Sequence, residues 1–366
     1  MPYTIDLIAA ARPNFMKVAP LYNALAALPD ALRPRLVHTG QHYDRNMSDA
    51  FFSDLGLPDP HAHLGVGGGT HAEQTGRVMI EYEKLCMRER PDCTIVVGDV
   101  NSTLACAIAA AKLHIRVAHL EAGLRSGDRS MPEEINRIVT DSIADVLWTP
   151  SPDGDENLAR EGVPAERICR VGNIMMDALE MSRARFEARQ YARQLGLAAG
   201  GYGVVTLHRP SNVDDPAQLR VLADMLRESA RSLPLVFPVH PRTHKCLVEF
   251  GLWETLKQPG ITLLEPAGYI EFMSLLSTSA VAITDSGGLQ EETTYLGIPC
   301  LTLRENTERP ITVTEGTNRL MRPGEVPHAI RLIHERRWPQ GRTPQLWDGR
   351  TAGRVVADLL RRAPTW

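Results

Sequence analysis

Residues 119–137 read His-Leu-Glu-Ala-Gly-Leu-Arg-Ser-Gly-Asp-Arg-Ser-Met-Pro-Glu-Glu-Ile-Asn-Arg. The stretch completes an apolar run, residues 115–120, which predicts a buried strand. Charged side chains follow at once, among them Glu121 and Glu133. A buried strand that opens onto charged loops is how α/β enzymes present reactive groups at the carboxyl end of a parallel sheet. The stretch therefore indicates an α/β fold with its chemistry at that edge.

A second junction of the same kind precedes this one. Residues 94–98 are apolar and Asp99 follows them directly. Two neighbouring strands would then bring Asp99, Glu121 and Glu133 towards one crevice. Several carboxylates around one point suit acid–base work on a weakly acidic group. We therefore predict that these three residues carry the catalysis.

Short apolar runs alternate with helical patterns along the whole chain, which is typical of parallel sheets covered by helices on both faces. Strands are predicted at residues 4–10, 35–39, 94–98, 115–120, 145–149, 203–207, 234–239, 261–265, 280–284 and 299–303. A chain of 366 residues, 43% of them hydrophobic, can bury two cores. We predict two Rossmann-like domains, residues 1–172 and 173–350, facing each other across a cleft, with the last helix (351–366) returning to the first domain.

Composition excludes several classes of protein. The net charge is −4 and no basic block occurs, so a nucleic-acid partner is not expected. No apolar run approaches the length of a membrane span, and the N-terminus lacks the charged region of a signal peptide. The six cysteines are scattered without C-x-x-C spacing, as expected for buried, reduced thiols in a cytoplasmic enzyme.

The first predicted strand ends in Ala9-Ala-Ala-Arg12-Pro-Asn-Phe-Met-Lys17. A G-x-G-x-x-G fingerprint is absent here, which argues against a tightly held dinucleotide. Arg12 and Lys17 lie at the start of a predicted helix, where cations beside free N–H groups suit a diphosphate. Helix capping or a solvated surface would explain the same two residues equally well.

A second candidate anion site follows the strand predicted at 280–284. Ser286, Gly287 and Gly288 open a helix there, and glycines allow backbone N–H groups to approach a phosphate. Glu292, one turn further on, can accept hydrogen bonds from a ribose diol. An ordinary strand–helix turn with a capping acid would also fit, but the combination favours a nucleotide.

Histidines recur at the ends of two other predicted strands. His208-Arg209 follows one and Pro238-Val-His240-Pro-Arg242 follows the next. A lone histidine is usually structural, but two imidazole–guanidinium pairs at equivalent points favour ligand contact. His119 either orients a carboxylate or acts directly. The remaining histidines lack metal-ligand spacing, so no metal is expected.

Together these blocks resemble the non-hydrolysing UDP-N-acetylglucosamine 2-epimerases, from one end of the chain to the other. The resemblance lies in Arg12-Pro-x-x-x-Lys17, Thr39-Gly-Gln-His42, Gly98-Asp99-x-x-Ser-Thr, His119-x-Glu121-Ala-Gly-Leu-Arg125, Pro132-Glu133-Glu134-x-Asn-Arg137, Gly172-Asn173, His208-Arg209, Pro238-Val-His240, Thr284-Asp-Ser-Gly-Gly-x-Gln-Glu-Glu292 and Thr307-Glu-Arg309-Pro. It implies a fold of the glycosyltransferase-B type, a UDP-sugar substrate, no cofactor and a cytoplasmic homodimer.

The resemblance also assigns roles to residues. It implies that UDP is held by Arg12, Ser286, Gly287, Gly288, Glu292 and Arg309, with Phe272 near the uracil. It implies catalytic roles for Asp99, Glu121, Glu133 and His208, with Lys17 and Arg137 alongside, while Arg209 and His240 are expected to contact ligand. Elimination of UDP would acidify the C2 proton, so that one carboxylate removes it and another carboxyl group returns a proton from the opposite face.

Three departures from the family bear on regulation and on the sugar. Regulated bacterial members bind a second UDP-GlcNAc through an Arg-Gln pair ahead of the helix that here carries Arg77. In this chain that stretch is Gly67-Gly-Gly-Thr-His-Ala-Glu-Gln74, so glycine replaces the pair, and Asp44 stands in place of a family glutamine. Pro210 follows the 208–209 pair where many members have Arg-Glu.

The same stretch leaves the exact reaction open. Relatives with a similar Gly-Gly-Thr-His stretch act on UDP-2,3-diacetamido-glucuronic acid, which is therefore a second candidate substrate. A hydrolysing epimerase would share the site and differ only in letting water capture the intermediate. A glycosyltransferase of the same fold and a non-catalytic UDP-sugar sensor would also share the UDP site, but neither needs three carboxylates in the first domain.

Overall fold

The computed structural model describes residues 2–10, 12–40 and 56–365 of a chain that divides into two compact units. Unit 1 comprises Met1–Met181 and Gln345–Trp366, and unit 2 comprises Ser182–Pro344. The sequence placed the limits at 172/173 and 350/351. Both limits therefore differ from the prediction, and unit 1 is larger than expected.

Gly172 explains the difference, because it lies in an interior turn of unit 1. Its φ is +94°, and a Cβ atom there would lie 2.2 Å from the carbonyl oxygen of Leu346. The next helix, α7 (Ile174–Arg189), carries Asp177, whose carboxylate accepts hydrogen bonds from the backbone N–H groups of Thr351 (3.0 Å) and Ala352 (2.8 Å). The start of α7 and the start of α17 (Thr351–Arg362) are thus joined within unit 1.

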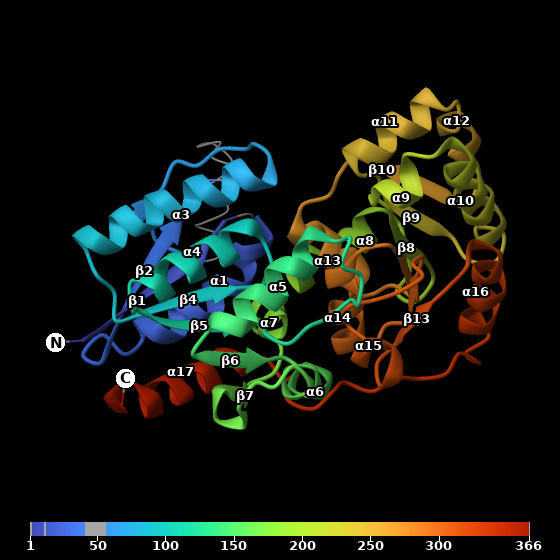
Figure 1. Cartoon of the computed structure of the whole chain (residues 1–366). Coiled ribbons are helices and arrows are strands. Elements are labelled where there is room, and N and C mark those ends of the chain that lie inside the picture. Colours follow the sequence, from blue (N-terminus) through green and yellow to red (C-terminus); the bar gives the residue numbers. More distant parts are fainter. Residues whose placement is uncertain (1, 11, 41–55, 366) are drawn as a thin grey trace. The chain divides into compact units, whose positions relative to one another are not determined.

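Unit 1 is built on a seven-stranded parallel sheet in the order β3-β2-β1-β4-β5-β6-β7 (Figure 1). The strands are β1 (Tyr3–Ala9), β2 (Leu32–His38), β3 (Ala62–His63), β4 (Cys93–Val97), β5 (Arg116–Leu120), β6 (Val146–Thr149) and β7 (Ile168–Arg170). The five strands predicted for this half of the chain are confirmed. The short strands β3 and β7 escaped prediction because neither forms an apolar run.

Helices enclose this sheet. They are α1 (Arg12–Ala26), α3 (His71–Arg88), α4 (Asn101–Lys112), α5 (Pro132–Ile143), α6 (Pro152–Arg160), α7 and α17. Helices α3 and α4 pack on each other and share a core with the strands, which includes Tyr82, Val96 and Cys106. Helix α17 packs on α1, and its Asp358 accepts a hydrogen bond (2.8 Å) from Nε1 of the fully buried Trp148 on β6.

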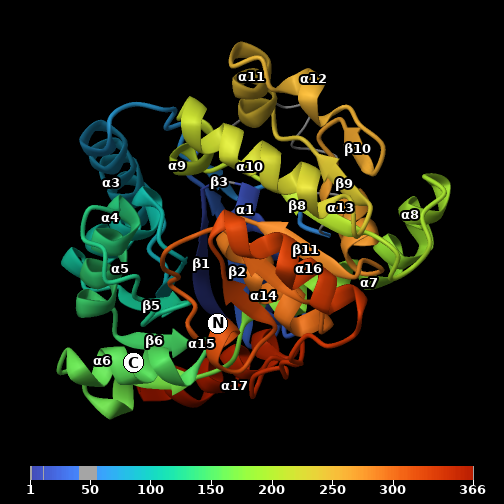
Figure 2. The same cartoon turned by 90° about the vertical axis from the view of Figure 1, so that its right-hand side faces the viewer.

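Unit 2 is built on a six-stranded parallel sheet in the order β10-β9-β8-β11-β12-β13 (Figures 1 and 2). The strands are β8 (Gly203–Thr206), β9 (Leu235–Pro238), β10 (Ile261–Leu264), β11 (Val281–Thr284), β12 (Cys300–Thr302) and β13 (Asn318–Leu320). The helices are α8 (Tyr191–Gln194), α9 (Pro210–Val213), α10 (Pro216–Ser229), α11 (Pro241–Glu249), α12 (Trp253–Leu256), α13 (Tyr269–Leu276), α14 (Gly287–Leu296), α15 (Ile311–Thr314) and α16 (Val326–His334). The five predicted strands are confirmed, and β13 is additional.

Both sheets reverse their strand order in the same way. In unit 1 the chain runs outward from β1 to β3 and then returns to β4 beside β1. In unit 2 it runs outward from β8 to β10 and then returns to β11 beside β8. Ligands of open α/β sheets bind at the carboxyl ends of the strands where the order reverses. The fold therefore directs attention to the ends of β1 and β4 and of β8 and β11.

The α/β class with two Rossmann-like domains is confirmed. All six cysteines are free thiols, and only Cys169 is not fully buried. Within the described ranges no helix is long and apolar enough to cross a lipid bilayer.

Candidate active site

Glu121 directly follows β5, the neighbour of β4, and is held by Lys17 of α1. Its side chain is 3% exposed and forms an ion pair with the Lys17 ammonium group. Its backbone is left-handed, with φ +70°, a strained conformation for a residue other than glycine. Its second oxygen, Oε1, is buried and has no hydrogen-bond partner among the described residues. A strained carboxylate with an unused oxygen is typical of a functional residue rather than a structural one.

Asp99, directly after β4, forms an ion pair with Arg137 of α5. Arg137 is 4% exposed and also pairs with Glu134 (2.8 Å). Glu134 accepts two further hydrogen bonds, from the backbone N–H groups of Ser126 (3.0 Å) and Gly127 (2.9 Å). Burial raises the pKa of Glu134, but these bonds and the Arg137 charge outweigh it and leave the pKa lowered. Arg137 thus joins Asp99, after β4, to Glu134, which in turn binds the backbone of the loop at Ser126 and Gly127.

Glu133 does not join this group. It lies in the first turn of α5 with an exposed side chain, and it forms no ion pair or hydrogen bond among the described residues. Its neighbour Glu134 is the buried member of the pair. The structure therefore brings Lys17, Glu121, Asp99 and Arg137 into two ion pairs but leaves Glu133 outside both.

His208, at the end of β8, is oriented by a carboxylate that the sequence patterns did not single out. Asp285, at the end of β11, is fully buried and lies 2.9 Å from His208 Nδ1. It also accepts hydrogen bonds from the backbone N–H groups of His208 (3.0 Å) and Arg209 (3.0 Å). Burial raises the pKa of Asp285, but the His208 bond and these N–H groups lower it overall. A carboxylate on Nδ1 leaves Nε2 of His208 as the nitrogen available to a ligand.

His240 and Arg209 lie beside this pair. The His208 and His240 rings are tilted, with centroids 5.6 Å apart. Burial and the charge of His208 lower the pKa of His240, whose Nδ1 accepts the Arg242 N–H at the start of α11. Arg209 donates from Nε to the Asp285 carbonyl oxygen (3.0 Å). The two predicted histidine–arginine segments therefore meet at one side of the β8–β11 switch point.

The two glycines that open α14 differ in their surroundings. A Cβ atom on Gly287 would lie 2.8 Å from Oε1 of Glu308 and 2.9 Å from Nη1 of Arg309, whereas one on Gly288 would meet nothing within 4 Å. Ser286 is the N-cap residue of the helix. A side chain at Gly287 would therefore have to displace the ends of the Glu308 and Arg309 side chains, whereas Gly288 leaves the backbone open to an approaching anion.

Arg309, expected to contact UDP, forms ion pairs with two carboxylates. Its Nε lies 2.9 Å from Oε2 of Glu291, and its Nη1 contacts Glu308. Glu308 also pairs with Arg304 (2.9 Å). Burial raises the pKa of Glu308, but Arg309 and Arg304 outweigh burial and leave the pKa lowered. The guanidinium of Arg309 is thereby fixed beside the N-terminus of α14.

Glu292, the predicted ribose ligand, is a buried acid. It is 7% exposed and accepts a hydrogen bond from the Tyr269 hydroxyl (3.1 Å). Burial, with a smaller contribution from the charge of Glu291, raises the pKa of Glu292 to about 7. Burial likewise raises the pKa of Tyr269, ahead of the effect of Glu292. Glu292 can therefore change its charge near neutral pH.

The remaining expected contacts are partly outside the described part of the chain. Phe272 on α13 is half-buried and packs against a cluster that includes Tyr202 and Leu275. Arg12 begins α1, but its side chain lies outside the described residues, as do Gln41, His42 and Asp44.

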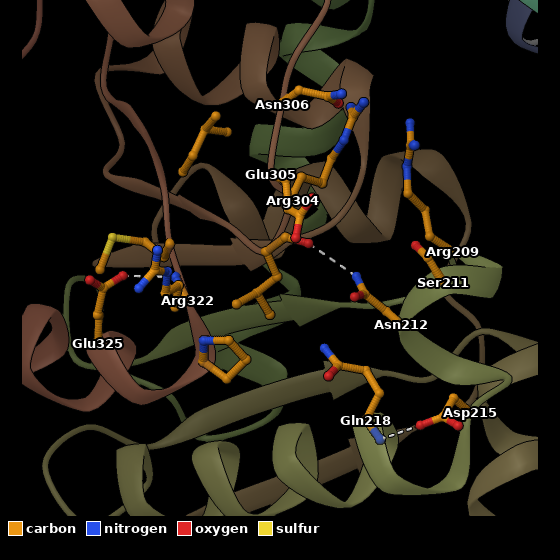
Figure 3. Close-up of a pocket in the computed structure, with 14 residues that line it drawn as sticks. Arg209, Ser211, Asn212, Asp215, Gln218, Arg304, Glu305, Asn306, Arg322 and Glu325 are labelled. Atoms are coloured by element: carbon orange, nitrogen blue, oxygen red, sulfur yellow. Dashed lines mark hydrogen bonds between the residues drawn. The ribbon is translucent and has the colours of Figure 1, made fainter. Parts of the chain in front are cut away.

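Arg209 also lines a cavity of about 1230 Å³ in unit 2 (Figure 3). The lining includes Asn212 of α9, Arg304 after β12 and Arg322 after β13. The Arg304 side chain is 5% exposed, and its Nη1 has no hydrogen-bond partner among the described residues. Burial, followed by the charge of Arg304, lowers the pKa of Arg209. Two guanidinium groups that destabilise each other favour an anionic ligand.

Four residues that shape the site were not among the predicted ones: Glu134, Tyr269, Asp285 and Arg304. Asp285 and Glu134 lie inside motifs that were recognised, and their position beside a predicted histidine or acid was the available signal. Tyr269 had no signal in the sequence, because it reaches Glu292 from a different helix.

Comparison with known proteins agrees with this geometry. The family model described as UDP-N-acetylglucosamine 2-epimerase matches residues 25–360. The UDP-N-acetylglucosamine 2-epimerase of Methanocaldococcus jannaschii is 42% identical over 324 residues, 87% of this chain and 88% of that protein. The UDP-2,3-diacetamido-2,3-dideoxy-D-glucuronate 2-epimerase of Pseudomonas aeruginosa is 39% identical over 363 residues, 97% of this chain and 98% of that protein.

Solved structures match along almost the whole chain. The crystal structure of the Methanocaldococcus jannaschii UDP-GlcNAc 2-epimerase in complex with UDP-GlcNAc and UDP has a TM-score of 0.85 at 38% identity, and the match covers 98% of this chain and 99% of that one. The Neisseria meningitidis UDP-GlcNAc 2-epimerase bound to UDP-GlcNAc has a TM-score of 0.85 at 26% identity, with 98% and 100% covered. The chain therefore belongs to the UDP-N-acetylglucosamine 2-epimerase family.

Proposed function

We propose that this protein interconverts UDP-GlcNAc and UDP-ManNAc by eliminating UDP and adding it back. The observation that carries the proposal is the pair of carboxylates that follow the neighbouring strands β4 and β5, each held by a cation: Glu121 by Lys17 and Asp99 by Arg137. Family membership supports the same reaction. Unit 2 would supply most of the groups that bind UDP, with Arg12 from unit 1, and unit 1 would supply the catalytic carboxylates.

The chemistry follows from the weak acidity of the C2 proton. Breakage of the bond between C1 and the diphosphate oxygen leaves positive charge at C1, which acidifies the proton on C2. A carboxylate removes that proton, and the electron pair forms the C1–C2 double bond of a glycal. A carboxyl group on the opposite face then returns a proton to C2 while the diphosphate oxygen bonds again to C1. Positioned acids and bases accelerate such transfers by about 100- to 10,000-fold.

UDP needs positive charge where it departs. We assign this role to Arg12, Arg309, the α14 N-terminus at Ser286–Gly288, and His208 oriented by Asp285. Cations and aligned N–H groups stabilise a leaving diphosphate because its charge grows in the transition state. Glu292 would bind the ribose, Phe272 would lie near the uracil, and Arg209 and His240 would contact the ligand from the other side of the switch point.

A time course in deuterated water tests the reaction. Solvent deuterium should enter at C2 of the sugar at the rate at which UDP-ManNAc appears, because the proton removed exchanges with solvent. Proton NMR of purified protein with UDP-GlcNAc as sole substrate follows both. Product that retains its original C2 hydrogen would rule out elimination. Free N-acetylmannosamine and UDP would identify a hydrolysing enzyme, and an absence of any reaction without an acceptor would favour a transferase.

The same assay with a second substrate tests the identity of the sugar. The 39% identity to the Pseudomonas aeruginosa epimerase over 97% of this chain, together with the Gly67–Thr70 stretch, favours UDP-2,3-diacetamido-glucuronic acid as a second candidate substrate. A larger kcat/KM for that nucleotide sugar than for UDP-GlcNAc would assign it as the substrate.

The glycines at 67–69 lead to a prediction about regulation. Replacing an Arg-Gln pair by glycine removes at least two hydrogen bonds to a charged ligand, each worth about 1.5–3 kcal/mol, which weakens activator binding by about 100-fold or more. Here Thr70 instead caps α3, and Arg77 pairs with Glu73 at 3.9 Å. We expect hyperbolic kinetics and prompt turnover of UDP-ManNAc supplied alone. A long lag that trace UDP-GlcNAc abolishes would contradict this expectation.

We further propose that the protein acts as a cytoplasmic homodimer in polysaccharide biosynthesis. Light scattering of the purified protein tests the dimer, and a monomeric mass would contradict it.

A further inference from the structure

His119 lies on β5 and is completely buried, yet both of its ring nitrogens face acceptors. Nδ1 lies 2.6 Å from Oδ1 of Asp141 on α5. Nε2 lies 2.8 Å from the carbonyl oxygen of Gly98, which directly precedes Asp99. A carbonyl oxygen can only accept a hydrogen bond, so Nε2 must carry a proton.

The charge of Asp141 decides the other nitrogen. Burial raises the pKa of Asp141, but the charges of and hydrogen bonds from His119 and Arg125 outweigh burial and lower it. Both oxygens of Asp141 face donors, because Oδ2 also accepts from the Gly123 N–H (3.0 Å) and from Arg125 Nη1 (2.7 Å). Beside a guanidinium group Asp141 is an ionised acceptor, so Nδ1 must also carry a proton. A neutral imidazole has only one N–H group, and either tautomer would turn a lone pair towards one of the two acceptors. The geometry accordingly requires an imidazolium ring.

The imidazolium charge is balanced by the carboxylate of Asp141 and by the ion pairs beyond it. Along the sheet, the strand neighbours of His119 are Val96 on β4 and Leu147 on β6, which are apolar. The charged groups beyond Asp141 are Arg125, at 2.7 Å from Asp141, and Glu161, at 2.7 Å from Arg125. Two cations thus alternate with two carboxylates, and the set is neutral as a whole. Complete pairing is what allows charges to remain buried.

The pair formed by His119 and Asp141 contacts each chain segment that carries a proposed acid or base. Its His119 end holds the Gly98 carbonyl beside Asp99. At its Asp141 end, Oδ2 accepts the Gly123 N–H (3.0 Å), which lies two residues after Glu121. Asp141 itself belongs to α5, the helix whose first turn carries Glu133. One buried contact therefore links the loops after β4 and β5 with α5.

We propose that His119 is a positioning residue, with a proton on each ring nitrogen and paired with Asp141, that fixes the backbone on which Asp99, Glu121 and Glu133 are carried. Its effect on turnover rests on the proposed epimerase function, whereas its protonation state does not. The ring itself does not transfer a proton, because both of its protons are engaged in hydrogen bonds inside the protein.

His38 provides a matched comparison within the same unit. It is also buried, at 2% exposed, and its ring stacks on Phe15 with centroids 5.1 Å apart. Burial, and to a smaller extent the charge of His63, lowers the pKa of His38 to about 4. At pH 7 His38 should thus be neutral in the same protein in which His119 is charged.

Nitrogen NMR of the wild-type protein, labelled at histidine, tests the protonation state without any substrate. We expect two protonated ring nitrogens for His119 at pH 7 and one for His38, with His119→Gln and His38→Gln used to assign the signals. A single protonated nitrogen on His119 at pH 7 would overturn the proposal, whether or not the protein is an epimerase.

Kinetics of folded variants test the positioning role. His119→Gln keeps at most one of the two donors, and a misplacement of about 1 Å costs about 100-fold in rate. We expect kcat and C2 exchange to fall by about that factor while the Kd for UDP stays unchanged, because the hydrogen-bond partners of His119 and Asp141 among the described residues include none assigned to UDP. Asp141→Asn should behave alike. Wild-type turnover in circular-dichroism-verified His119→Gln would overturn the proposal. If wild-type protein shows no C2 exchange with any UDP-sugar, the proposed function fails, and the NMR result still decides the protonation.

Discussion

Replacement of Asp99 by Asn or of Glu121 by Gln should lower epimerisation turnover by about 100-fold or more and leave UDP binding unchanged. The proposed reaction requires a carboxylate to take up a proton at C2 and a carboxyl group to return one, and an amide can do neither. We expect the same loss for Glu133→Gln. None of these three side chains is assigned to the diphosphate.

The structural cost of these changes differs between the two ion-paired residues. Asp99 is 34% exposed, so Asp99→Asn removes one partner of Arg137 at a partly solvated position, and Glu134 still pairs with that arginine. Glu121 is 3% exposed, and Glu121→Gln leaves the Lys17 ammonium group, itself 14% exposed, without its counter-ion. Leaving a buried charge unpaired destabilises a protein. Folding of Glu121→Gln should therefore be verified by circular dichroism before its turnover is interpreted.

Turnover measured by NMR and UDP affinity measured by calorimetry distinguish the residues assigned to catalysis from those assigned to UDP binding. Arg12→Ala and Glu292→Ala should weaken UDP binding, in contrast to the three carboxylate variants. Glu81→Gln is a matched control, since Glu81 is a partly exposed acid on α3 whose only ion pair among the described residues is with Lys84. It should retain wild-type values of both quantities. Equal effects of the two groups of variants on UDP affinity would contradict the division of roles.

Glu292→Gln should stabilise the ligand-free protein at alkaline pH, by up to about 3 kcal/mol, while it weakens UDP binding. The pKa of Glu292 rises from 4.5 to about 7 on folding, and a rise of that size corresponds to about 3 kcal/mol between its protonated and ionised forms. The folded state therefore binds the proton more tightly than the unfolded state. The contribution of this proton to the free energy of unfolding is complete below pH 4.5 and is lost as the pH rises through about 7.

Glutamine resembles the protonated acid, so the variant does not lose this stability as the pH rises. Above pH 7 the wild-type protein holds a buried, ionised carboxylate, and the variant holds a neutral amide that can still accept from Tyr269. We expect the two free energies of unfolding, from urea titrations, to agree at pH 4 and to differ at pH 8. Equal stabilities at both values would contradict the raised pKa.

UDP binding should show the opposite dependence on pH. A ribose diol donates hydrogen bonds, which an ionised carboxylate accepts best. UDP affinity of the wild-type protein should therefore rise between pH 6 and pH 8, and binding at pH 6.5 should release protons. Calorimetry in buffers of different ionisation enthalpy measures that release. Tyr269→Phe should move the change to higher pH, because it removes a hydrogen bond that lowers the pKa of Glu292. A UDP affinity that does not change with pH would contradict the assignment of Glu292 to the ribose.

The sequence by itself determined the sheets and the places where they carry chemistry. Each predicted strand is a run of apolar neighbours, and each of Asp99, Glu121 and His208 directly follows such a run. This information is local, since burial of a strand and exposure of the residue after it depend on adjacent residues. Recurrence of the family motifs in order then indicated the reaction.

Only the tertiary structure decided which of these side chains meet. Neighbouring residues on a helix point in different directions, so Glu133 and Glu134 could not both face Arg137, and packing of α5 buried Glu134. Glu121 meets Lys17 across 104 residues, and His208 meets Asp285 across 77. Such contacts depend on the order in which parallel strands assemble, which no local pattern specifies. For the same reason His119 was ambiguous until Asp141 and Gly98 were found at its two nitrogens.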